Sequence, residues 1–599
     1  MFSDILANKK FNIQERIKKL NQKLLGPQSY QIGLDGGGSA KPHQMDLEAD
    51  KCRKEIEALT LELAQTETAF KALNTAKEAP FVWDIAFVEI FEDEKEGFDI
   101  VVGNPPYVNY KAIYNPNISR SFITTDNTKL YKANLSRAVY GSYPHFFGYK
   151  KSNDTVAYKL DARSDLYIYF YFCGLSLLNN KGSFCFITSN SWLDVDFGTN
   201  LQEFLLKCSH IKLIVDNENK RSFKEADVNT VIVLLSAADD KTNWGLDKIA
   251  RFVMFRVPFE HIVSPVIFDE IEEITERKAT KEYRIFPIRQ DKLLEDGYEL
   301  PEEEEINKIK GPLIKNASYI GNKWGGKYLR APDIFWAIIN KGKDILVPLS
   351  SIAYLATGVK EGGYSNYIVS KVKANIRSQK NKNCDIIKDT SSHNRINIEQ
   401  ADSIIFDGSN SVIQKCNSLK CPLLWLSGRG YTHKAHLNPY LFPFSGNYIG
   451  INPKRDDNTA ILCLLLNSTF VIFNSEILGR SKGIGGAACV FTKSDLGKIL
   501  IINPDNLNND QKNELLQIAK NLNNRNFMTI FEELGFQKPN ETFSNINSED
   551  ISLDRILKDR RELDKFIFEA IGLNELEQLD IYKAVIILVK NRAIKAKNI

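Results

Sequence analysis

Paired cysteines are absent from this sequence: its nine cysteines are scattered and form no C-x-x-C motif. Such pairs are the usual sign of a zinc site or of a redox motif. Several of the cysteines lie inside apolar runs, so we expect reduced, buried thiols and a cytoplasmic location. His433 and His436 have no cysteine or acidic partner at useful spacing, and the sequence therefore predicts no metal site.

Long apolar runs are also absent. The longest, such as 460-AILCLLLNSTFVIF-473, are too short and too interrupted to span a membrane. The first residues, MFSDILANKKFN, lack the pattern of a signal peptide. We therefore expect a protein that neither spans a membrane nor is secreted.

A strong excess of one charge is missing as well, since 599 residues carry a formal net charge of only +3. This balance neither requires nor excludes a nucleic-acid partner, and any basic surface has to be local. Hydrophobic residues make up 43% of the chain and aromatic residues 11%, which is typical of a globular protein with a large core. The length predicts about three or four domains.

The most informative stretch is 97-GFDIVVGNPPYVNY-110. Residues 98–102 have the apolar character of a strand buried in a parallel sheet, and Asn104-Pro105-Pro106-Tyr107 follows at its carboxyl end. In open α/β sheets, ligands bind just beyond the carboxyl ends of the strands. The sequence therefore favours a binding site here over the alternative, a plain proline turn after a buried strand.

These residue types suit one kind of chemistry. An exocyclic amine on a planar base is a weak nucleophile because its lone pair is delocalised, and two acceptors aimed at its N–H groups would localise that pair. The Asn104 side-chain oxygen can be one acceptor. The Pro105 carbonyl can be the other, since Pro106 restricts the preceding residue to extended geometry. Tyr107 offers a flat face on which an extruded base can stack.

Asn104 to Tyr107 resemble the N-P-P-Y motif of the amino-methyltransferases, which use S-adenosylmethionine. Alternating strand and helix signals over 81–240 are typical of a doubly wound α/β sheet. Within them, D-L-Y…F-I-T…S-W-L and then F-K-E-A-D-V-N-T-V-I-V-L-L are similar to the later motifs of TaqI-like adenine-N6 DNA methyltransferases, including type IIG restriction enzymes and phage-defence methyltransferases. The resemblance implies that Phe223 stacks on a flipped adenine opposite Tyr107, and a core phenylalanine is the alternative.

The chain departs from this family upstream of the motif, where the family places a strand with a Gly-rich cofactor loop. Residues 1–80 instead predict two charged amphipathic helices that form a hairpin or a short antiparallel coiled coil. The run Gly33–Gly38 has no strand before it, which favours a linker over a cofactor loop. Asp84 is a candidate for cofactor contact, with a surface or capping role as the alternative. We therefore expect that a partner chain supplies the cofactor loop, or that the chain is a truncated product.

Residues 341–505 resemble the target-recognition domain of the same enzymes, with short β-like runs between glycines and an L-L-N-S…K-x-D-L element. Basic and aromatic residues cluster in its predicted loops, where phosphate and base-edge contacts need them. Taken singly, each is explained as a solvated surface residue, and as a set they predict DNA contacts. They are Lys360, Tyr364, Arg377, Lys380, Lys382, Arg429, Tyr431, His433, Lys434, Arg480 and Lys482.

Two further segments flank this predicted domain. Residues 241–340 are mixed and charged, and 269–284 and 300–312 predict helices or solvated faces without a nuclease constellation. Residues 506–599 predict amphipathic helices, one of which ends at Gly572, that brace the recognition domain.

The predicted fold class is α/β: a Rossmann-like methyltransferase sheet, incomplete at its N-terminal side, with an N-terminal helical hairpin, an α+β target-recognition domain and a helical C-terminus. The resemblance implies methyl transfer from S-adenosylmethionine to N6 of an adenine in double-stranded DNA. One alternative is a DNA-binding specificity module without chemistry. Another is a methyltransferase that acts on a protein glutamine, and the recognition-like domain argues against it.

Overall fold

The computed structural model describes residues 2–25, 51–60, 62–64, 66–67, 83–91, 96–218, 222–223, 228–262, 264–299, 318–359, 368–370, 384–405, 418–482 and 488–597. These residues belong to two compact units. The first comprises Met1–Asp99 with Leu178–Asn180, and the second comprises Ile100–Leu177 with Lys181–Ile599.

A helical hairpin forms most of the first unit. Helix α1 spans Phe2–Leu25, and the described residues of 51–67 are also helical. Two ion pairs and an apolar seam hold the helices antiparallel: Lys10–Glu67 (2.8 Å), Arg16–Glu55 (2.9 Å), and Ile13, Leu20 and Leu59. The predicted hairpin is confirmed. The run Gly33–Gly38 lies outside the described residues.

Two short helices follow in the same unit, α3 (Trp83–Ala86) and α4 (Val88–Phe91). The rings of Trp83, Phe87 and Phe91 all meet the ring of Phe98 edge-on, with centroids 5.3 to 6.0 Å apart. An aromatic cluster therefore anchors the start of the strand that leads to the Asn104 motif.

A mixed sheet of seven strands organises the second unit, in the order β1-β2-β4-β3-β5-β7-β6. The strands are β1 (Phe98–Gly103), β2 (Leu178–Ser189), β3 (Ile211–Asn217), β4 (Thr230–Ser236), β5 (Ile249–Phe255), β6 (Lys278–Ala279) and β7 (Tyr283–Arg289). β3 and β5 are parallel, whereas β4 is antiparallel to β2 and β3, and β7 is antiparallel to β5. The predicted α/β class is confirmed.

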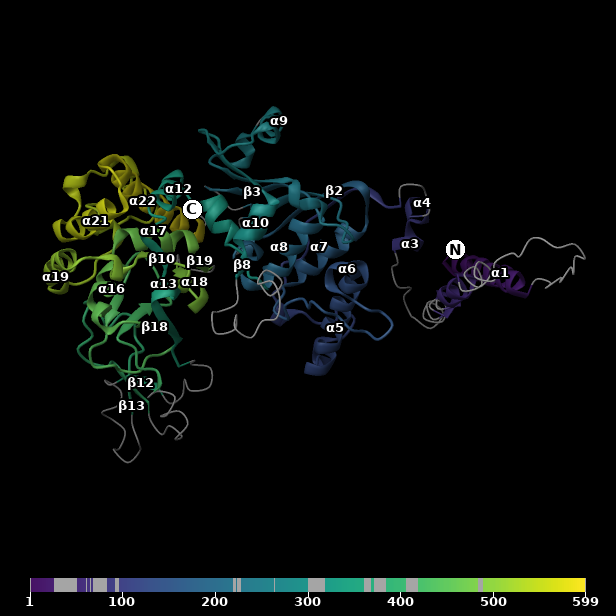
Figure 1. Ribbon diagram of the computed structural model, residues 1–599, viewed down its shortest axis with the longest axis horizontal. Helices are drawn as coiled ribbons and strands as arrows, with labels where there is room; N and C mark the ends of the chain where they lie inside the picture. The colour runs from purple at the N-terminus through teal and green to yellow at the C-terminus, as the bar shows by residue number, and fades with distance from the viewer. Residues whose placement is uncertain are drawn as a thin grey trace, which may run out of the picture. The chain divides into compact units, whose positions relative to one another are not determined.

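Helices cover the two faces of this sheet unequally. α7 (Leu166–Ser176) is apolar nearly all round, although Phe170 and Cys173 are exposed on one side, and with α8 (Thr199–Cys208) it packs on one face of the sheet. On the opposite face, α9 (Val266–Glu273) covers β3, β5 and β7 (Figure 1). Ile271 of α9 belongs to the hydrophobic cluster that forms this contact.

β1 differs from its prediction. The sequence predicts a buried strand, but Ile100 is 68% exposed and Val102 is 75% exposed. The reason is topological: β1 lies at the edge of the sheet, and among the described residues only β2 pairs with it. Its other side chains point to the covered face, where Val101 lies near Gly174 of α7 and Gly103 lies against Phe186.

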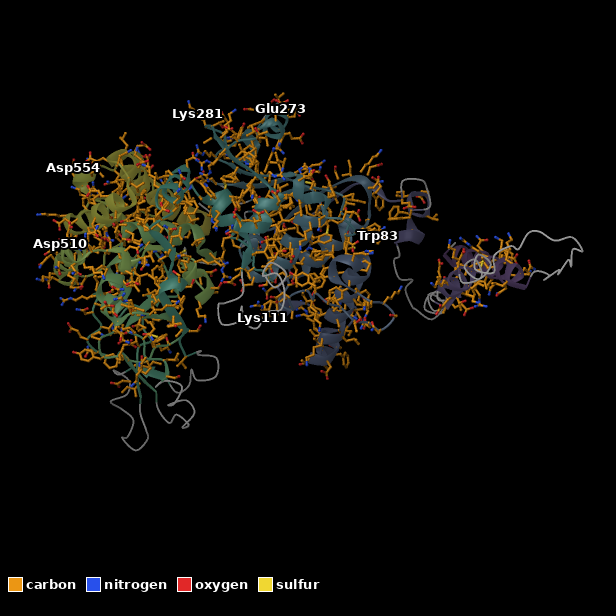
Figure 2. All side chains as sticks on the ribbon, viewed as in Figure 1. Trp83, Lys111, Glu273, Lys281, Asp510 and Asp554 are labelled. Carbon is orange, nitrogen blue, oxygen red and sulfur yellow. The ribbon has the colours of Figure 1, made fainter. Side chains whose placement is uncertain are left out.

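One predicted boundary also moves, at residue 240. The sheet continues beyond residue 240, because the apolar run 249–255 forms β5 and is followed by α9, β6, β7 and α10 (Gln290–Asp296). Residues 269–284 therefore divide between a helix and two strands, with Glu273 and Lys281 projecting at the periphery (Figure 2). Residues 300–312 lie outside the described part.

The C-terminal part of the second unit combines several small sheets with helices. The largest sheet has the order β11-β18-β15-β17. The strands are β10 (Leu346–Pro348), β11 (Ala353–Thr357), β12 (Ile368–Ser370), β13 (Cys384–Ile386), β14 (Ser403–Ile405), β15 (Leu423–Leu426), β16 (Gly428–Arg429), β17 (Ala435–Leu437), β18 (Tyr448–Pro453), β19 (Arg480–Lys482), β20 (Ala488–Val490) and β21 (Leu500–Ile502). The main helices are α12 (Asp333–Lys341), α16 (Thr459–Leu466), α17 (Thr469–Leu478), α18 (Lys493–Gly497), α19 (Asn509–Asn523), α21 (Lys558–Ile571) and α22 (Glu575–Lys597). The predicted mixture of strands and helices and the helical C-terminus are confirmed.

The apolar run 460–473 is helical, and its prediction as β-like is wrong. Ser468 breaks it into α16 and α17, because its hydroxyl accepts a hydrogen bond from the Val471 N–H and caps the second helix. No single helix among the described residues is long and apolar enough to cross a membrane; α16 and α17 together pass on length and composition alone, bent by 75°. Both are buried in the domain core.

The predicted boundary at 505 does not separate two cores. Ile449 of β18, Phe473 of α17, Phe568 of α21 and Val585 of α22 belong to one hydrophobic cluster. Gly572 ends α21 as predicted, in a left-handed conformation (φ 82°) that glycine adopts without strain. The C-terminal helices are thus part of the same folded body as the small sheets.

Candidate active site

The Asn104 motif forms an extended loop at the carboxyl end of β1. Pro105 is buried and holds the loop against the sheet, whereas Asn104 on one side and Pro106 on the other are exposed. The Asn104 side chain makes no hydrogen bond to any residue that the structure describes. Its amide is therefore available to a ligand at the position where open α/β sheets bind one.

Tyr107 is fixed to the neighbouring strand. Its hydroxyl donates a hydrogen bond to the Ile187 carbonyl of β2 at 3.1 Å. Burial raises the pKa of Tyr107 above its ordinary value, so the hydroxyl remains a neutral donor. One face of the Tyr107 ring can therefore contact a second aromatic side chain.

That second group is Phe223. The ring centroids of Tyr107 and Phe223 lie 6.4 Å apart and the ring planes are tilted by 54°. Phe223 is only partly buried. A hydrogen bond of 2.9 Å from Thr230 of β4 to the Ser222 hydroxyl holds the backbone beside it. The structure thus brings together the two aromatic residues that the sequence paired.

Asp165 and Leu166 of the D-L-Y motif, together with Lys132, hold the loop after Tyr107. Asp165, just before α7, accepts a hydrogen bond from the Tyr110 N–H at 2.8 Å. The adjacent Leu166 N–H donates to the Val108 carbonyl at 2.9 Å, and the Lys132 ammonium donates to the Tyr110 carbonyl. The D-L-Y motif therefore fixes the position of residues 108–110 through hydrogen bonds. Its position in the sequence does not show this role.

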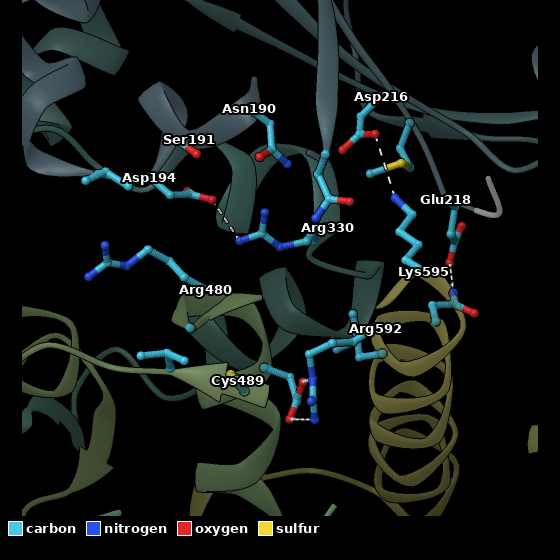
Figure 3. Close-up of a pocket in the computed structure, with 18 of the residues that line it drawn as sticks. Asn190, Ser191, Asp194, Asp216, Glu218, Arg330, Arg480, Cys489, Arg592 and Lys595 are labelled. Carbon is cyan, nitrogen blue, oxygen red and sulfur yellow. Dashed lines mark hydrogen bonds and ion pairs between the residues drawn. The ribbon is translucent and has the colours of Figure 1, made fainter. Parts of the chain in front are cut away.

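A cavity of about 530 Å³ lies between the sheet and the C-terminal part (Figure 3), and its lining does not include Asn104, Tyr107 or Phe223. Asn190 and Asn229 line it on the sheet side and join the ends of β2 and β4 through an N–H to carbonyl hydrogen bond of 2.9 Å. Ion pairs cross it: Arg330 bonds to Asp194 at 2.9 Å, and Lys595 of α22 lies 3.7 Å from Asp216.

Three of the predicted DNA contacts are buried, contrary to the prediction of surface loops. Arg429 pairs with Glu476 at 2.8 Å, and Arg592 binds the same carboxylate at 2.8 Å. The Nε2 of His433 bonds to the Leu466 carbonyl, and Lys434 donates to the carbonyls of Thr390 and His393. All three side chains hydrogen-bond inside the protein, and Arg429, His433 and Lys434 are 4%, 7% and 8% exposed.

The other predicted contacts have different positions. Tyr431 is partly buried and packs edge-on against Phe531 and Phe543. Arg480 lines the cavity; its Nη2 bonds to Asp495 at 2.9 Å, while its Nε has no partner within the described part of the chain. The remaining residues lie outside the described part, either wholly or in their side chains: Lys360, Tyr364, Arg377, Lys380, Lys382, Lys482 and Asp84.

The L-L-N-S and K-x-D-L elements connect neighbouring helices and strands through hydrogen bonds. Asn467 bonds to both the N–H and the carbonyl of Ala435, which ties α16 to β17. Asp495 caps α18 and accepts from Arg480 and from the buried ammonium of Lys323, which also donates to the Asp194 carbonyl. These contacts join the C-terminal part to the sheet.

The described residues include no glycine-rich cofactor loop next to β1. No unit of strand, glycine loop and helix precedes β1 within the ranges that the structure describes, and no strand of those ranges pairs with the outer edge of β1. The same ranges contain no group of three or more His, Cys, Asp or Glu residues that could hold a metal ion.

Residues 39–223 match the family described as Eco57I restriction-modification methylase. This segment contains the Asn104 motif and Phe223 and makes up less than half of the chain. The match supports a DNA methyltransferase of a restriction-modification system. No curated protein sequence matches the chain significantly.

Similar solved structures also come from restriction-modification systems. They include the type IIG restriction endonuclease BpuSI (10% identity, TM-score 0.30), the type IIL enzyme MmeI in complex with DNA (13%, 0.38) and the EcoKI M protein (10%, 0.18). The matches cover 79%, 79% and 39% of this chain and 54%, 54% and 41% of those proteins, so the chain spans about half the length of BpuSI or MmeI. TM-scores this low do not establish a common fold.

Proposed function

We propose that the chain is the catalytic and DNA-reading part of a site-specific DNA methyltransferase that modifies adenine at N6, in a restriction-modification or phage-defence system. The observation that carries the proposal is the pairing of Tyr107 with Phe223 beside an exposed Asn104 at the end of β1. These residues lie in the segment that matches a restriction-modification methylase.

Each residue has a separate role on a flipped adenine. Tyr107 and Phe223 hold the two faces of the base. The Asn104 side-chain oxygen and the Pro105 carbonyl accept hydrogen bonds from the two N6 protons and localise the nitrogen lone pair. Catalysis by this chain is therefore positioning and electrostatics. Tyr107 is no general base, because its hydroxyl already donates to Ile187.

The aromatic pair has to adjust when a base enters. Stacked bases are spaced by about 3.4 Å, so a base between two parallel rings needs about 7 Å between their centroids. The observed distance is 6.4 Å at a tilt of 54°. A small opening and a rotation of Phe223 are sufficient, since Tyr107 is fixed to β2.

The cavity between the sheet and the C-terminal part offers a surface for the DNA strand. Arg480 lines it, and 29% of its side chain is exposed although its Nη2 pairs with Asp495. A phosphate oxygen can accept a hydrogen bond from such a guanidinium. Of the recognition residues whose side chains are described, Arg480 is thus the best placed to contact DNA.

The methyl donor is S-adenosylmethionine in this proposal, and a partner chain holds it. The test is transfer of labelled methyl groups to DNA by this chain together with candidate partners, followed by mapping of N6-methyladenine in the product. Methylated adenine at one repeated sequence supports the proposal, and label found only on protein refutes it.

A second function is favoured by the lack of a donor site among the described residues: a specificity module that binds DNA without chemistry. The two functions differ in one variant. In the module, Asn104→Ala leaves the activity of a reconstituted complex unchanged, whereas in the methyltransferase it removes that activity.

A further inference from the structure

Arg284 is a buried cation without a carboxylate in contact. It lies on β7 and is 7% exposed. Its Nη2 donates hydrogen bonds to the Leu329 carbonyl at 2.6 Å and to the Arg330 carbonyl at 3.3 Å. Its Nε and Nη1 make no hydrogen bond to any residue that the structure describes, and Arg284 takes part in no ion pair there. Two of its three nitrogen atoms are therefore available to a ligand.

The other described arginines that are buried as deeply do have a carboxylate in contact. Arg429 and Arg560 are each 4% exposed, and they pair with Glu476 and Glu533. Burial lowers the pKa of Arg560, but Glu533 reverses this effect and raises that pKa above its ordinary value. At Arg284, burial lowers the pKa and the effect is not reversed. A buried charge without a counter-ion destabilises a fold, so binding of an anion would stabilise Arg284.

Arg284 lines the cavity of about 530 Å³ between the sheet and the C-terminal part. Figure 3 shows other cations around the same space. Each of them has a carboxylate partner: Arg330 with Asp194, Arg480 with Asp495, Arg592 with Glu476, and Lys595 with Asp216. Glu218 and Asp333 oppose the effect of burial on the pKa of Arg284 from a distance, and Glu218 accepts a hydrogen bond from Asn591 at 2.9 Å. Among the described cations of this lining, Arg284 is thus the one without a carboxylate in contact.

The size of the cavity favours a small molecule over DNA as the source of the anion. Sites for small molecules have volumes of about 300 to 1,000 Å³. A volume of 530 Å³ corresponds to about 8 Å in each direction, whereas the major groove of DNA alone is about 12 Å wide. A duplex can contact exposed lining residues such as Arg480, but it is too wide to reach Arg284.

The lining also provides contacts for the rest of such a molecule. Met254 of β5, Val490 of β20 and Leu588 of α22 form an apolar wall. Asn190 and Asn229 supply amide groups, which can donate and accept hydrogen bonds at the edge of a ring. A guanidinium, amide groups and an apolar wall together suit an anionic molecule that carries a ring.

We propose that this cavity binds a small phosphorylated molecule of the size of a mononucleotide, with its phosphate group on Arg284 and its ring on the apolar wall. Hydrogen bonds between a guanidinium and a phosphate are charge-assisted and stronger than those between neutral groups. The site does not depend on the proposed methyl transfer, because Asn104, Tyr107 and Phe223 are not in its lining. The ligand contacts both the sheet and the C-terminal part, so its binding should raise the unfolding temperature.

Calorimetric titration of the full chain with AMP, with ATP and with a short DNA duplex tests the proposal. We expect at least one of the two nucleotides to bind with a dissociation constant in about the micromolar range, and we expect that the duplex does not displace it. If neither nucleotide binds, the proposal is wrong. If the duplex displaces the bound nucleotide, the proposal is also wrong, because the phosphate that Arg284 binds is then that of the DNA backbone.

Arg284→Gln should weaken binding of the nucleotide by about 10- to 100-fold, because it removes a charge-assisted hydrogen bond. Arg251→Gln is the matched control and should leave the affinity unchanged. Arg251 lies on the neighbouring strand β5, donates its Nε to the Ile274 carbonyl at 3.2 Å, and is not in the cavity lining. Equal affinities of the Arg284→Gln variant and the wild type would overturn the site.

Two further measurements keep the test independent of any folding defect at position 284. Val490→Trp fills the cavity without changing a charge and should abolish nucleotide binding, and wild-type binding by this variant would overturn the proposal. Without a ligand, Arg284→Gln should not lower the unfolding temperature, because it removes a buried charge that has no counter-ion in contact. A loss as large as that of Glu476→Gln, which breaks a buried ion pair, would make Arg284 a structural cation and refute the assigned role.

Discussion

Tyr107 and Phe223 face each other with 6.4 Å between their ring centroids, although they come from loops after two different strands of one sheet. Tyr107 is anchored through its hydroxyl to Ile187, whereas Phe223 has no such anchor among the described residues. One wall of the proposed base site is therefore fixed and the other is adjustable. This asymmetry separates the expected effects of substitutions at the two positions.

Asn104→Ala tests the chemistry. Removing one preorganised hydrogen-bonding group from an active site lowers kcat by about 100- to 1000-fold, and we expect a loss of that size in methyl transfer by the complex. Because Asn104 is exposed and makes no described side-chain hydrogen bond, the free energy of unfolding should change by less than about 0.5 kcal/mol. Labelled methyl transfer and urea unfolding measure the two quantities.

Asn117→Ala is the matched control, since Asn117 is an exposed asparagine in the segment after the motif. It should keep wild-type methyl transfer. A fully active Asn104→Ala variant would remove the methyltransferase proposal and leave the specificity module.

Phe223→Ala should weaken capture of the flipped base. Stacking of a base on an aromatic ring contributes about 1 to 3 kcal/mol, so we expect a loss of about 5- to 150-fold in kcat/KM. Phe223→Tyr keeps the ring and should keep most of the activity. Fluorescence of 2-aminopurine at the mapped target base reports whether the base leaves the stack.

Phe122→Ala provides the comparison, because Phe122 is 73% exposed and removal of its ring should leave base capture unchanged. If Phe223→Ala gives the same 2-aminopurine signal as the wild type, Phe223 is a packing residue.

The sheet could be predicted from sequence because its signals are local. Apolar runs of strand length form β1, β3 and β4, and the amphipathic run at 199–208 forms α8. The same reasoning failed at 461–478, where apolar residues continue without a period. The helix cap at Ser468 divides the run into two helices. This cap depends on one hydrogen bond of the Ser468 hydroxyl, which the apolar pattern does not predict.

The site could be predicted only where motif residues are neighbours in the chain. Asn104 to Tyr107 follow a strand, and that context is visible in the sequence. The sequence shows that Arg429 and Lys434 are charged, but it does not show whether they are buried. Burial depends on partners far away in the chain, such as Glu476 and the His393 carbonyl. The exposure of Ile100 and Val102 could not be predicted either, since an apolar strand looks the same at an edge and in a core.

Glu476→Gln should strongly destabilise the second unit. Glu476 is 6% exposed and lies between Arg429 and Arg592, both within 2.8 Å. Breaking a buried ion pair costs about 3 to 5 kcal/mol because it leaves an uncompensated charge, and here two arginines lose their carboxylate. Urea unfolding measures the loss. Glu569→Gln breaks only an exposed pair with Lys565 and should change stability by less than about 1 kcal/mol; equal effects of both variants would contradict the assigned role.

The ionisation of Asp495 should make the free energy of unfolding depend on pH in the acidic range. Burial alone would raise its pKa, but Lys323 and Arg480 lower the pKa of Asp495 to about 2. An ordinary aspartate has a pKa of about 3.9, so the unfolded chain takes up this proton first as pH falls. The stabilisation is present above about pH 4 and is lost as the pH falls toward 2. The slope of unfolding free energy between pH 4 and pH 2 should be smaller in Asp495→Asn, and an unchanged slope would show that other carboxyl groups carry it.

The isolated chain should bind S-adenosylmethionine weakly or not at all. The described residues offer the acceptors and aromatic faces for an adenine, but none of the described strands lies beside the outer edge of β1. A cofactor that depends on a neighbouring strand for its loop loses most of its contacts without it, so calorimetry should detect no heat of binding at micromolar cofactor. Addition of a partner chain that carries such a strand and loop should restore binding. Tight binding by this chain alone would place the donor site within its own residues and make the run Gly36–Gly38 the first candidate for the loop.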